Sequence, residues 1–249
     1  MIQLEALTLG YGQQILLDHV SANLDGGGLI ALLGRNGSGK STLLRATAGL
    51  GTIKSGRILL AGKDLAELRP EELARTVSFV TTEKVRIPNL KCRDVVALGR
   101  APYTNWVGRL QPQDREIVAK SLALLDMSAY AERTMDQMSD GECQRIMIAR
   151  ALTQDTPIIL LDEPTSFLPN RYELGILLQK LAHKQNKCIL FSTHELDIAL
   201  TLCDSIALID HPHLHYLPTR QMINSGHIER LFRNETITFD PKELRIRIR

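Results

Sequence analysis

A glycine-rich segment at residues 34–42, GRNGSGKST, is the feature that most constrains this 249-residue chain. An apolar run at residues 29–33 precedes it, and a helix-forming stretch begins at Leu43. This is the pattern G-x-x-x-x-G-K-[ST] in the strand, loop and helix setting that the motif requires. The glycines let backbone N–H groups surround a pyrophosphate, and the helix N-terminus adds about half a positive charge. Because a chance lysine in a glycine-rich turn explains these flanks poorly, the segment predicts a nucleoside triphosphate site.

The residue types within this segment predict separate contacts. Lys40 is expected to reach the β- and γ-phosphates, and the hydroxyl of Ser41 is expected to ligate Mg²⁺. The predicted phosphate-binding residues are Gly34, Asn36, Gly37, Ser38, Gly39, Lys40, Ser41 and Thr42.

The composition is that of an ordinary soluble protein, with 44% hydrophobic residues, 23% charged residues and a formal net charge of +2. So small a charge argues against a dedicated nucleic-acid-binding protein. The four cysteines are scattered without a zinc-binding spacing, so we expect free thiols in a reducing compartment. The N-terminus lacks the features of a signal peptide, and no apolar run approaches ~18 residues. A membrane role is therefore expected to depend on a partner.

Short apolar runs predict an α/β core. Five of them read as buried strands, at residues 29–33, 77–80, 158–161, 189–191 and 206–209. Helical patterns such as residues 173–184 lie between them, and this alternation is typical of a parallel sheet covered on both faces. Three alternating patterns predict a smaller antiparallel sheet near the N-terminus, at residues 2–8, 20–24 and 57–64.

Residues 82–156 show no strand pattern. Helical periodicity predicts three helices there, at residues 93–99, 113–125 and 142–152. We therefore expect a helical subdomain at residues 82–156, inserted into a nucleotide-binding core with a β-subdomain at residues 1–81 and 157–249. The tail after residue 211 reads as irregular, with strand-like pieces at residues 237–239 and 244–248.

Two acidic residues, Asp162 and Glu163, follow the apolar run at residues 158–161. At the carboxyl edge of a parallel sheet, this pair is expected to lie beside the phosphate loop. Asp162 would hold Mg²⁺ through water, and Glu163 would polarise an attacking water as a general base, a role worth about 10²–10⁴ in rate. Solvent-facing acids at a strand end are common, so the pair gains its meaning from the glycine-rich segment upstream.

Residues 138–145, MSDGECQR, precede the predicted helix that leads to this strand. Ser139 and Glu142 have the spacing of a capping box, in which the serine caps the helix. The segment also resembles the LSGGQ or LSGGE signature of the ATP-binding cassette (ABC) ATPases. The resemblance implies that this capped helix N-terminus faces the γ-phosphate bound by the opposite subunit, with Ser139 and the N–H of Gly141 as donors.

Two further residues extend the resemblance. Tyr11, in the sequence LGYG, resembles the aromatic residue that stacks on adenine, with an ordinary hairpin aromatic as the alternative. His194 follows a predicted strand, as does the family's switch histidine, which contacts the γ-phosphate. The resemblance thus implies catalytic roles for Lys40, Glu163 and His194, with ATP and Mg²⁺ as cofactors.

This resemblance covers nearly the whole chain and implies one ABC nucleotide-binding domain at residues 1–249. The implied fold class is α/β: a P-loop NTPase core of the ABC type, with an N-terminal antiparallel β-subdomain and an inserted helical subdomain. The activity that it implies is ATP hydrolysis, slow or dependent on partners.

Three positions depart from the family's pattern. Thr82 stands where the family has a glutamine that senses Mg²⁺ and the attacking water, and its shorter hydroxyl is expected to bond a metal-bound water. Asp140 replaces the first glycine of the signature, and we expect its carboxylate to face away from the phosphate that it would repel. Pro169 stands where an aspartate usually links the two subunits' active sites, so this departure bears on the coupling between the two ATP sites. Together with Ser41 and Asp162, Thr82 completes the expected metal set.

Residues 93–103, RDVVALGRAPY, resemble the VALGRxPY segment of importers for iron–siderophore, haem and vitamin B12. The rules for helix ends also explain its glycine and proline. The importer resemblance implies a homodimer that sandwiches two ATP molecules, two integral-membrane permease subunits and an extracytoplasmic substrate-binding protein. The chain would then be a peripheral subunit on the cytoplasmic face of the inner membrane, and no nucleic-acid partner is expected.

Two alternative functions stay open at this stage. One is a soluble, non-transport ABC ATPase of the iron–sulfur assembly type. The other is an ATP-binding regulatory subunit with low turnover, which the departures at Thr82, Asp140 and Pro169 would explain. A DNA-repair ATPase is excluded, because the compact segment between phosphate loop and signature leaves no room for the long coiled coil of those proteins.

Three other patterns favour structural explanations. The alternating histidines of residues 211–215 predict a surface loop more strongly than a metal site. Tyr103 and Trp106 predict an exposed loop at a protein interface rather than a base-stacking site. Alternating charges at residues 245–249 are typical of a strand with one solvated face.

Overall fold

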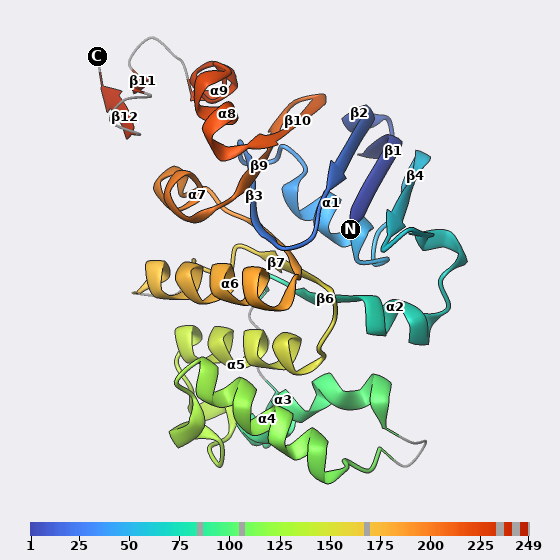
Figure 1. Cartoon of the computed structure of the whole chain (residues 1–249), viewed down its shortest axis with the longest axis vertical. Coiled ribbons are helices and arrows are strands. Elements are labelled where there is room, and N and C mark those ends of the chain that lie inside the picture. The colour runs from blue at the N-terminus through green and yellow to red at the C-terminus, as the bar shows by residue number, and fades with distance from the viewer. Residues whose placement is uncertain (84–86, 105–107, 167–169, 233–236, 241–244, 249) are drawn as a thin grey trace.

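A six-stranded sheet forms the centre of the computed structural model, which describes residues 1–83, 87–104, 108–166, 170–232, 237–240 and 245–248 (Figure 1). The strand order is β10-β9-β3-β8-β7-β6. The strands are β3 (Gly28–Gly34), β6 (Val77–Val80), β7 (Ile158–Asp162), β8 (Cys188–Ser192), β9 (Ser205–Asp210) and β10 (His213–Pro218). Neighbouring strands pair in parallel except β10, which runs antiparallel to β9. The five buried strands expected from the apolar runs are therefore confirmed.

Both faces of the parallel strands are buried, which explains why their sequences are continuously apolar. In β3, Leu29 and Ala31 belong to one hydrophobic cluster, and Ile30 and Leu32 belong to the other. The first cluster is completed by α6 (Arg171–Gln185), α7 (Leu196–Leu202) and the helices that precede β7. The second is completed by α1 (Lys40–Thr47) and a second, smaller sheet.

The smaller sheet is antiparallel, as the sequence predicts, with the strand order β2-β1-β4-β5. Its strands are β1 (Ile2–Tyr11), β2 (Gln14–Leu24), β4 (Ser55–Leu60) and β5 (Lys63–Asp64). Apolar residues of β1 such as Leu4 and Leu7 pack into the same cluster as Leu44 of α1. The helix that begins at Lys40 is thus held between two sheets, and this fixes the phosphate loop that precedes it.

The described residues between β6 and β7 form helices joined by turns and loops, and they include no strand, apart from one isolated bridge between Lys91 and Thr134. Its α-helices are α3 (Cys92–Ala97), α4 (Pro112–Leu124) and α5 (Asp140–Thr153), and its 3₁₀ turns are η2 (Leu98–Tyr103), η3 (Ser128–Tyr130) and η4 (Met135–Gln137). Figure 1 shows this group at the lower end of the molecule, beneath α6. All three expected helices are present, although the first is shorter and continues as a 3₁₀ turn. A further helix, α2 (Pro70–Thr76), and the turn η1 (Leu65–Glu67) connect the smaller sheet to β6.

The prediction of an irregular tail after residue 211 is wrong. The histidine-rich segment is no surface loop, because it enters β10, where His213 pairs with Asp210 and Pro218 pairs with Ser205 of β9. Helices α8 (Thr219–Asn224) and α9 (His227–Phe232) follow. The two strand-like pieces are confirmed as β11 (Ile237–Asp240) and β12 (Arg245–Ile248). The backbone pairing with β9 outweighs the weak strand propensity of this sequence.

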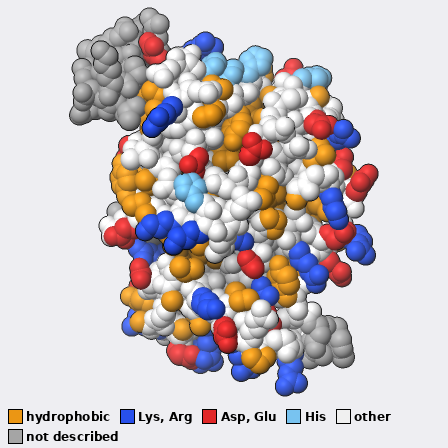
Figure 2. All heavy atoms as spheres, in the orientation of Figure 1, with side chains coloured by type: hydrophobic (Ala, Val, Ile, Leu, Met, Phe, Trp, Pro, Cys, Tyr) orange, Lys and Arg blue, Asp and Glu red, His pale blue; other side chains and the backbone are white. Residues whose placement is uncertain are grey.

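Three observations concern the surface charge, the cysteines and the length of the helices. Charged side chains of both signs are interspersed over the face in Figure 2. Cys92, Cys143, Cys188 and Cys203 are buried thiols, as the sequence predicts, and burial raises the pKa of Cys188 to about 12. In the part of the chain that the structure describes, no helix has both the length and the apolarity needed to cross a bilayer.

The segment that resembles the importer sequences is packed against α5. The guanidinium of Arg100 lies 3.9 Å from the ring centroid of Tyr103, whose hydroxyl donates a hydrogen bond to the carbonyl of Gln154. Tyr103 is half-buried by these contacts, so the expectation of an exposed aromatic is wrong at this residue. Trp106 lies outside the described residues.

Replacing Gly99 with alanine should destabilise the protein by about 1–3 kcal/mol, the usual cost of overpacking. A Cβ at Gly99 would lie 2.3 Å from the carbonyl oxygen of Arg150 in α5, so the two backbones would have to separate. Urea unfolding would measure the loss, with the exposed neighbour Ala101→Ser as the matched control. Equal midpoints for the Gly99→Ala protein and the wild type would show that this close approach is not required.

Candidate nucleotide site

The phosphate loop joins the end of β3 to the start of α1. Gly37 and Gly39 adopt the left-handed backbone conformation, with φ values of 76° and 103°. The N–H of Ser38 donates to the carbonyl of Arg35 at 3.1 Å and closes the turn. A Cβ on Gly39 would also lie 3.2 Å from that of Leu16, so both conformation and space require glycine there. The backbone conformation of the loop therefore explains the glycines at positions 37 and 39 of the motif.

Lys40 is folded over this loop. Its side chain is buried, and Nζ donates to the carbonyls of Gly34 at 2.9 Å and Arg35 at 3.3 Å. Burial lowers the pKa of Lys40, while the nearby carboxylates of Glu163 and Asp162 oppose that shift. The ammonium is thus held at the position where the motif places the phosphates.

Asp162, at the carboxyl end of β7, lies beside Ser41. Its Oδ1 accepts hydrogen bonds from the hydroxyl of Ser41 at 3.1 Å and from that of Ser192 at 2.6 Å. The carboxylate is buried, with 2% of the residue exposed. A hydroxyl and a carboxylate that meet in this way fit Mg²⁺, which prefers oxygen ligands. Sequence reasoning missed Ser192, although its position at the carboxyl end of a neighbouring parallel strand could have indicated it.

Glu163 and His194 lie next to each other at the same edge of the sheet. The His194 Nδ1 is 3.8 Å from Oε1 of Glu163, and the hydroxyl of Ser166 donates to Oε2 at 3.1 Å. Glu163 has a φ of 48°, and its N–H donates to Oγ of Ser192 at 2.9 Å. A left-handed non-glycine residue costs about 1–3 kcal/mol, so its neighbours must hold it in this conformation.

Tyr11 lies on the other side of the loop, at the end of β1. Its hydroxyl is 3.0 Å from Oγ1 of Thr42, and 62% of the residue is exposed. A cleft of about 630 Å³ runs from this ring along the loop to Glu163. Its lining comprises Tyr11, Gln14, Leu16, Asn36, Gly37, Gly39, Lys40, Ser41, Thr42 and Glu163. Most of the predicted loop residues therefore share one cleft with the candidate base, and Gln14 and Leu16 are additions that the sequence did not indicate.

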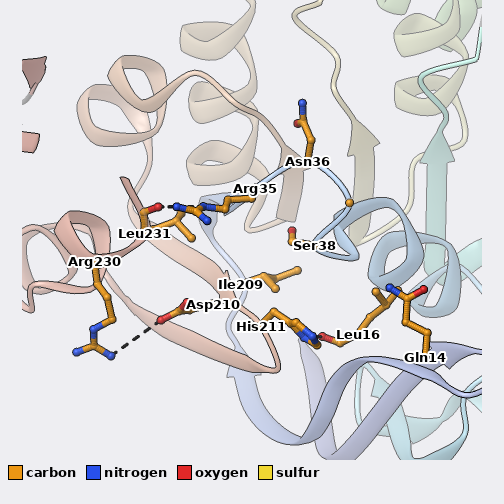
Figure 3. A pocket seen from close by; sticks show the side chains of 11 residues that line it. Gln14, Leu16, Arg35, Asn36, Ser38, Ile209, Asp210, His211, Arg230 and Leu231 are labelled. Atoms are coloured by element: carbon orange, nitrogen blue, oxygen red, sulfur yellow. Dashed lines mark hydrogen bonds and ion pairs between the residues drawn. The ribbon is translucent and has the colours of Figure 1, made fainter. Parts of the chain in front are cut away.

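A second hollow of about 380 Å³ adjoins this cleft and shares Gln14, Leu16, Asn36 and Gly37 with it (Figure 3). Here the phosphate loop meets the C-terminal helices, because Nε of Arg35 donates to the carbonyl of Leu231 at 3.2 Å. The hydroxyl of Ser38 is buried without a hydrogen-bond partner in the described part of the chain. Since the two hollows share loop residues, we treat the second as part of the same site.

The signature segment lies in the helical region, at the start of α5. Oγ of Ser139 accepts from the N–H of Glu142 at 3.3 Å, and the N–H of Ser139 donates to Oε2 of Glu142 at 2.8 Å. This is the capping box that the sequence predicts, and its hydrogen bonds lower the pKa of Glu142. Asp140 is the first residue of α5, and Gly141 follows it. Among the described residues, those that line the cleft of this chain include neither Ser139 nor Gly141.

Two departures from the family's pattern, Thr82 and Pro169, stay predictions for different reasons. Thr82 follows β6 at the same carboxyl edge, but the hydrogen bonds that Arg45 of α1 donates here reach its two neighbours, Oγ1 of Thr81 at 3.4 Å and Oε1 of Glu83 at 2.7 Å. A contact of Thr82 with the metal set thus stays a prediction. Pro169 lies outside the described residues.

Comparisons with known proteins agree with this geometry. Residues 17–166 match the family described as ABC transporter. An ABC transporter ATP-binding protein of Methanocaldococcus jannaschii is 40% identical over 211 residues, which cover 84% of this chain and 73% of the relative. The petrobactin import ATP-binding protein of Bacillus anthracis is 32% identical over 244 residues, which cover 96% of this chain and 89% of the relative. The ATP-binding cassette MJ0796, solved as a dimer with ADP and phosphate, has 26% identity and a TM-score of 0.77, with 88% of this chain and 99% of that chain covered.

Proposed function

This chain belongs to the ABC transporter family, and we propose that it is the ATP-hydrolysing subunit of an importer for an iron chelate, haem or cobalamin. The observation that carries the ATPase proposal is the convergence of Lys40, Ser41 and Glu163 at one cleft. Asp162 is hydrogen-bonded to Ser41, and His194 lies beside Glu163. The importer proposal is supported by the petrobactin import relative and by the VALGRxPY-like segment at residues 93–103.

ATP binding follows from the lining of the cleft. The ring of Tyr11 stacks on adenine, while the loop N–H groups and Nζ of Lys40 hold the phosphates. Lys40 then exchanges its bonds to the loop carbonyls for bonds to phosphate oxygens. Ser41, Asp162 and, through water, Thr82 would hold Mg²⁺, which would supply positive charge to the phosphates.

Hydrolysis is assigned to the pair at the ends of β7 and β8. Glu163 accepts a proton from the attacking water, and Ser166 and Ser192 orient it through its carboxylate and its backbone N–H. His194 contacts the γ-phosphate from the same edge of the sheet. Its side chain lies next to Glu163 and is 56% exposed, so it is accessible to a bound nucleotide. The water oxygen bonds to the γ-phosphorus as the bond from that phosphorus to the bridging oxygen breaks and ADP leaves. Groups at the ends of two adjacent strands thus contact the attacking water and the γ-phosphate.

A second copy of the chain completes the site. In the proposed homodimer, the capped start of α5 in each copy brings Ser139 and the N–H of Gly141 to the γ-phosphate held by the other copy. ATP contacts both copies, so its binding favours the closed dimer, and hydrolysis removes that bridge. The MJ0796 cassette, which was solved as a dimer with ADP and phosphate, supports this arrangement.

The helical segment at residues 82–156 is the proposed docking unit for two integral-membrane permease subunits. The remaining segments, residues 1–81 and 157–249, form the proposed ATP-binding core with its β-subdomain. Opening and closing of the dimer would move the docked permeases between their two states, and an extracytoplasmic binding protein would deliver the cargo. This places the chain at the cytoplasmic face of the inner membrane, as a peripheral subunit.

Co-expression with a candidate multi-span permease tests the importer proposal. We expect the two proteins to co-purify, and a binding protein loaded with ferric siderophore, haem or cobalamin should stimulate ATP hydrolysis several-fold in proteoliposomes. The Lys40→Ala complex should assemble but release no phosphate, because the cation for the phosphates is missing. Full activity without any membrane partner would favour the soluble ATPase, and absence of phosphate release in every sample would favour the regulatory subunit.

A further inference from the structure

Glu195 is a buried carboxylate beside the site that the scheme above does not use. It directly follows His194, it is 7% exposed, and it is the N-cap residue of α7. Its Oε1 accepts a hydrogen bond from the hydroxyl of Thr165 at 3.2 Å, and its Oε2 lies 2.9 Å from Nη1 of Arg171. A buried charge is costly unless it is paired and hydrogen-bonded. The hydrogen bond from Thr165 and the ion pair with Arg171 offset this cost, while Oε2 accepts no hydrogen bond in the described part of the chain.

The two partners of Glu195 belong to the segment that follows the candidate base. Thr165 is two residues after Glu163, and Arg171 is the first residue of α6. Thr165 is itself buried, with 4% exposed, whereas the Arg171 side chain is 51% exposed. The Glu195 carboxylate thus contacts this segment at two points: at Thr165, close to Glu163, and at Arg171, farther along the chain.

Residues at the end of β8 make further contacts with the segment that begins at Asp162. The hydroxyl of Ser192 bonds Asp162 and accepts the N–H of Glu163, and His194 lies 3.8 Å from the Glu163 carboxylate. The turn at residues 192–195 therefore contacts the segment that begins at Asp162 before, at and after the candidate base. The contacts of Glu195 are the ones farthest along this segment.

We propose that Glu195 is a positioning residue for ATP hydrolysis: by holding Thr165 and Arg171, it fixes the position of Glu163 relative to His194. The inference rests on the proposed function, because it takes Glu163 as the base and His194 as the γ-phosphate contact. Glu195 does not line the cleft among the described residues, so it acts through its neighbours. Its loss should therefore change the rate of hydrolysis and leave nucleotide binding unchanged.

The test compares Glu195→Gln and Arg171→Met in the full chain. A misplacement of about 1 Å at a reacting group can cost about 10²-fold in rate, so we expect kcat for ATP hydrolysis to fall about 10- to 100-fold in Glu195→Gln. Arg171→Met should show a smaller loss, and Arg171→Lys, which keeps the charge, should restore most of it. The Kd for ATP should stay within about twofold of the wild-type value, because the phosphate loop is unchanged.

A double variant and a control separate positioning from general stability. If Glu195 acts through Arg171, the Glu195→Gln/Arg171→Met protein should be no slower than Glu195→Gln alone. Tyr172→Phe is the matched control, because it removes the adjacent hydrogen bond between α6 and Asp197 without touching Glu195, and its kcat should equal that of the wild type.

Three results would overturn the inference: an unchanged kcat in Glu195→Gln, equal losses in kcat and ATP affinity with a lowered Tm, or additive losses in the double variant. Arg171→Met keeps the test decisive if Glu195→Gln folds poorly, since the Arg171 side chain is half-exposed. A wild-type protein that binds ATP without hydrolysing it would instead contradict the proposed ATPase function, so the two failures can be told apart.

Discussion

Replacing Glu163 with glutamine should lower ATP hydrolysis about 10²–10⁴-fold and should trap the protein as an ATP-bound dimer. The amide has the shape of the carboxylate but cannot accept the proton of the attacking water. Lys40, Ser41 and Asp162 are unchanged, so the cleft still holds the nucleotide. ATP that binds but is not cleaved keeps its contacts with both copies, and the closed state accumulates.

The structure indicates that glutamine at this position keeps the hydrogen bonds of Glu163. The backbone of Glu163 is held by the bond from its N–H to Ser192, and glutamine keeps that bond. The hydroxyl of Ser166 can still donate to the amide oxygen, as it does to Oε2 of Glu163. The changes are thus confined to the charge at Oε1, which faces His194, and to the lost basicity. The fold and the affinity for ATP should therefore stay close to those of the wild type.

Two measurements check the prediction. Phosphate release with Mg-ATP reports the rate, and light scattering coupled to size exclusion reports the mass of the protein with ATP, with ADP and without nucleotide. Only ATP should convert the variant to a dimer. Glu173→Gln, an exposed change ten residues along the chain, is the control and should hydrolyse ATP like the wild type. A variant that stays monomeric with ATP would contradict either the two-copy site or the assignment of the base.

The parts of the fold that the sequence predicted are those coded by local pattern. The glycine-rich loop was predictable because Gly37 and Gly39 take conformations that other residues adopt at a cost, and the parallel strands because both of their faces are apolar. The strand β10 was not predictable in this way, because it is half-exposed along its length and depends on pairing with β9. Tyr103 was misplaced for a related reason: its partners, Arg100 and Gln154, meet only in the folded chain.

The same distinction applies to the site. Lys40, Ser41, Asp162 and Glu163 belong to short motifs, and the structure brings them together. Ser192 and Glu195 carry no motif, and their importance comes from contacts with residues about 30 positions away. The roles of Ser139, Gly141 and Thr82 depend on a second copy or on a bound metal, so a single chain leaves them as proposals.

Replacing Asp114 with asparagine should destabilise the protein by about 3–5 kcal/mol, because it leaves a buried cation without its counter-charge. Asp114 and Arg100 are both buried, and Nε of Arg100 donates to Oδ1 of Asp114 at 2.8 Å. The guanidinium also donates to the carbonyl of Thr153, so the pair connects η2, α4 and the end of α5. This loss corresponds to a Tm about 6–20 °C lower in a chain of this length.

The sign of the pH dependence follows from the pKa of Asp114. Burial would raise that pKa, but the N–H of Gln111 and the guanidinium of Arg100 lower it overall, below the ordinary value of 3.8. A carboxylate with a lowered pKa stabilises the fold above its unfolded-state pKa, and this contribution is lost as the pH falls through the folded-state pKa. The difference between wild type and Asp114→Asn should therefore be constant from about pH 5 to pH 8 and should shrink in acid.

Thermal and urea unfolding of four proteins would separate the pair from its surroundings. Arg100→Met should be about as damaging as Asp114→Asn, whereas the double variant should recover much of the loss, because it leaves no unpaired buried charge. Glu132→Gln is the matched control: Glu132 pairs with Lys91 in the same helical region, but its side chain is 60% exposed, so its Tm and urea midpoint should stay close to those of the wild type. Melting of Asp114→Asn within one or two degrees of the wild type would show that water reaches this pair. Packing would then not explain the presence of Arg100 in the VALGRxPY-like segment. If the expected losses are found, the role of Arg100 is to hold the helical segment on α5, the helix whose start is proposed to bring Ser139 to a second copy.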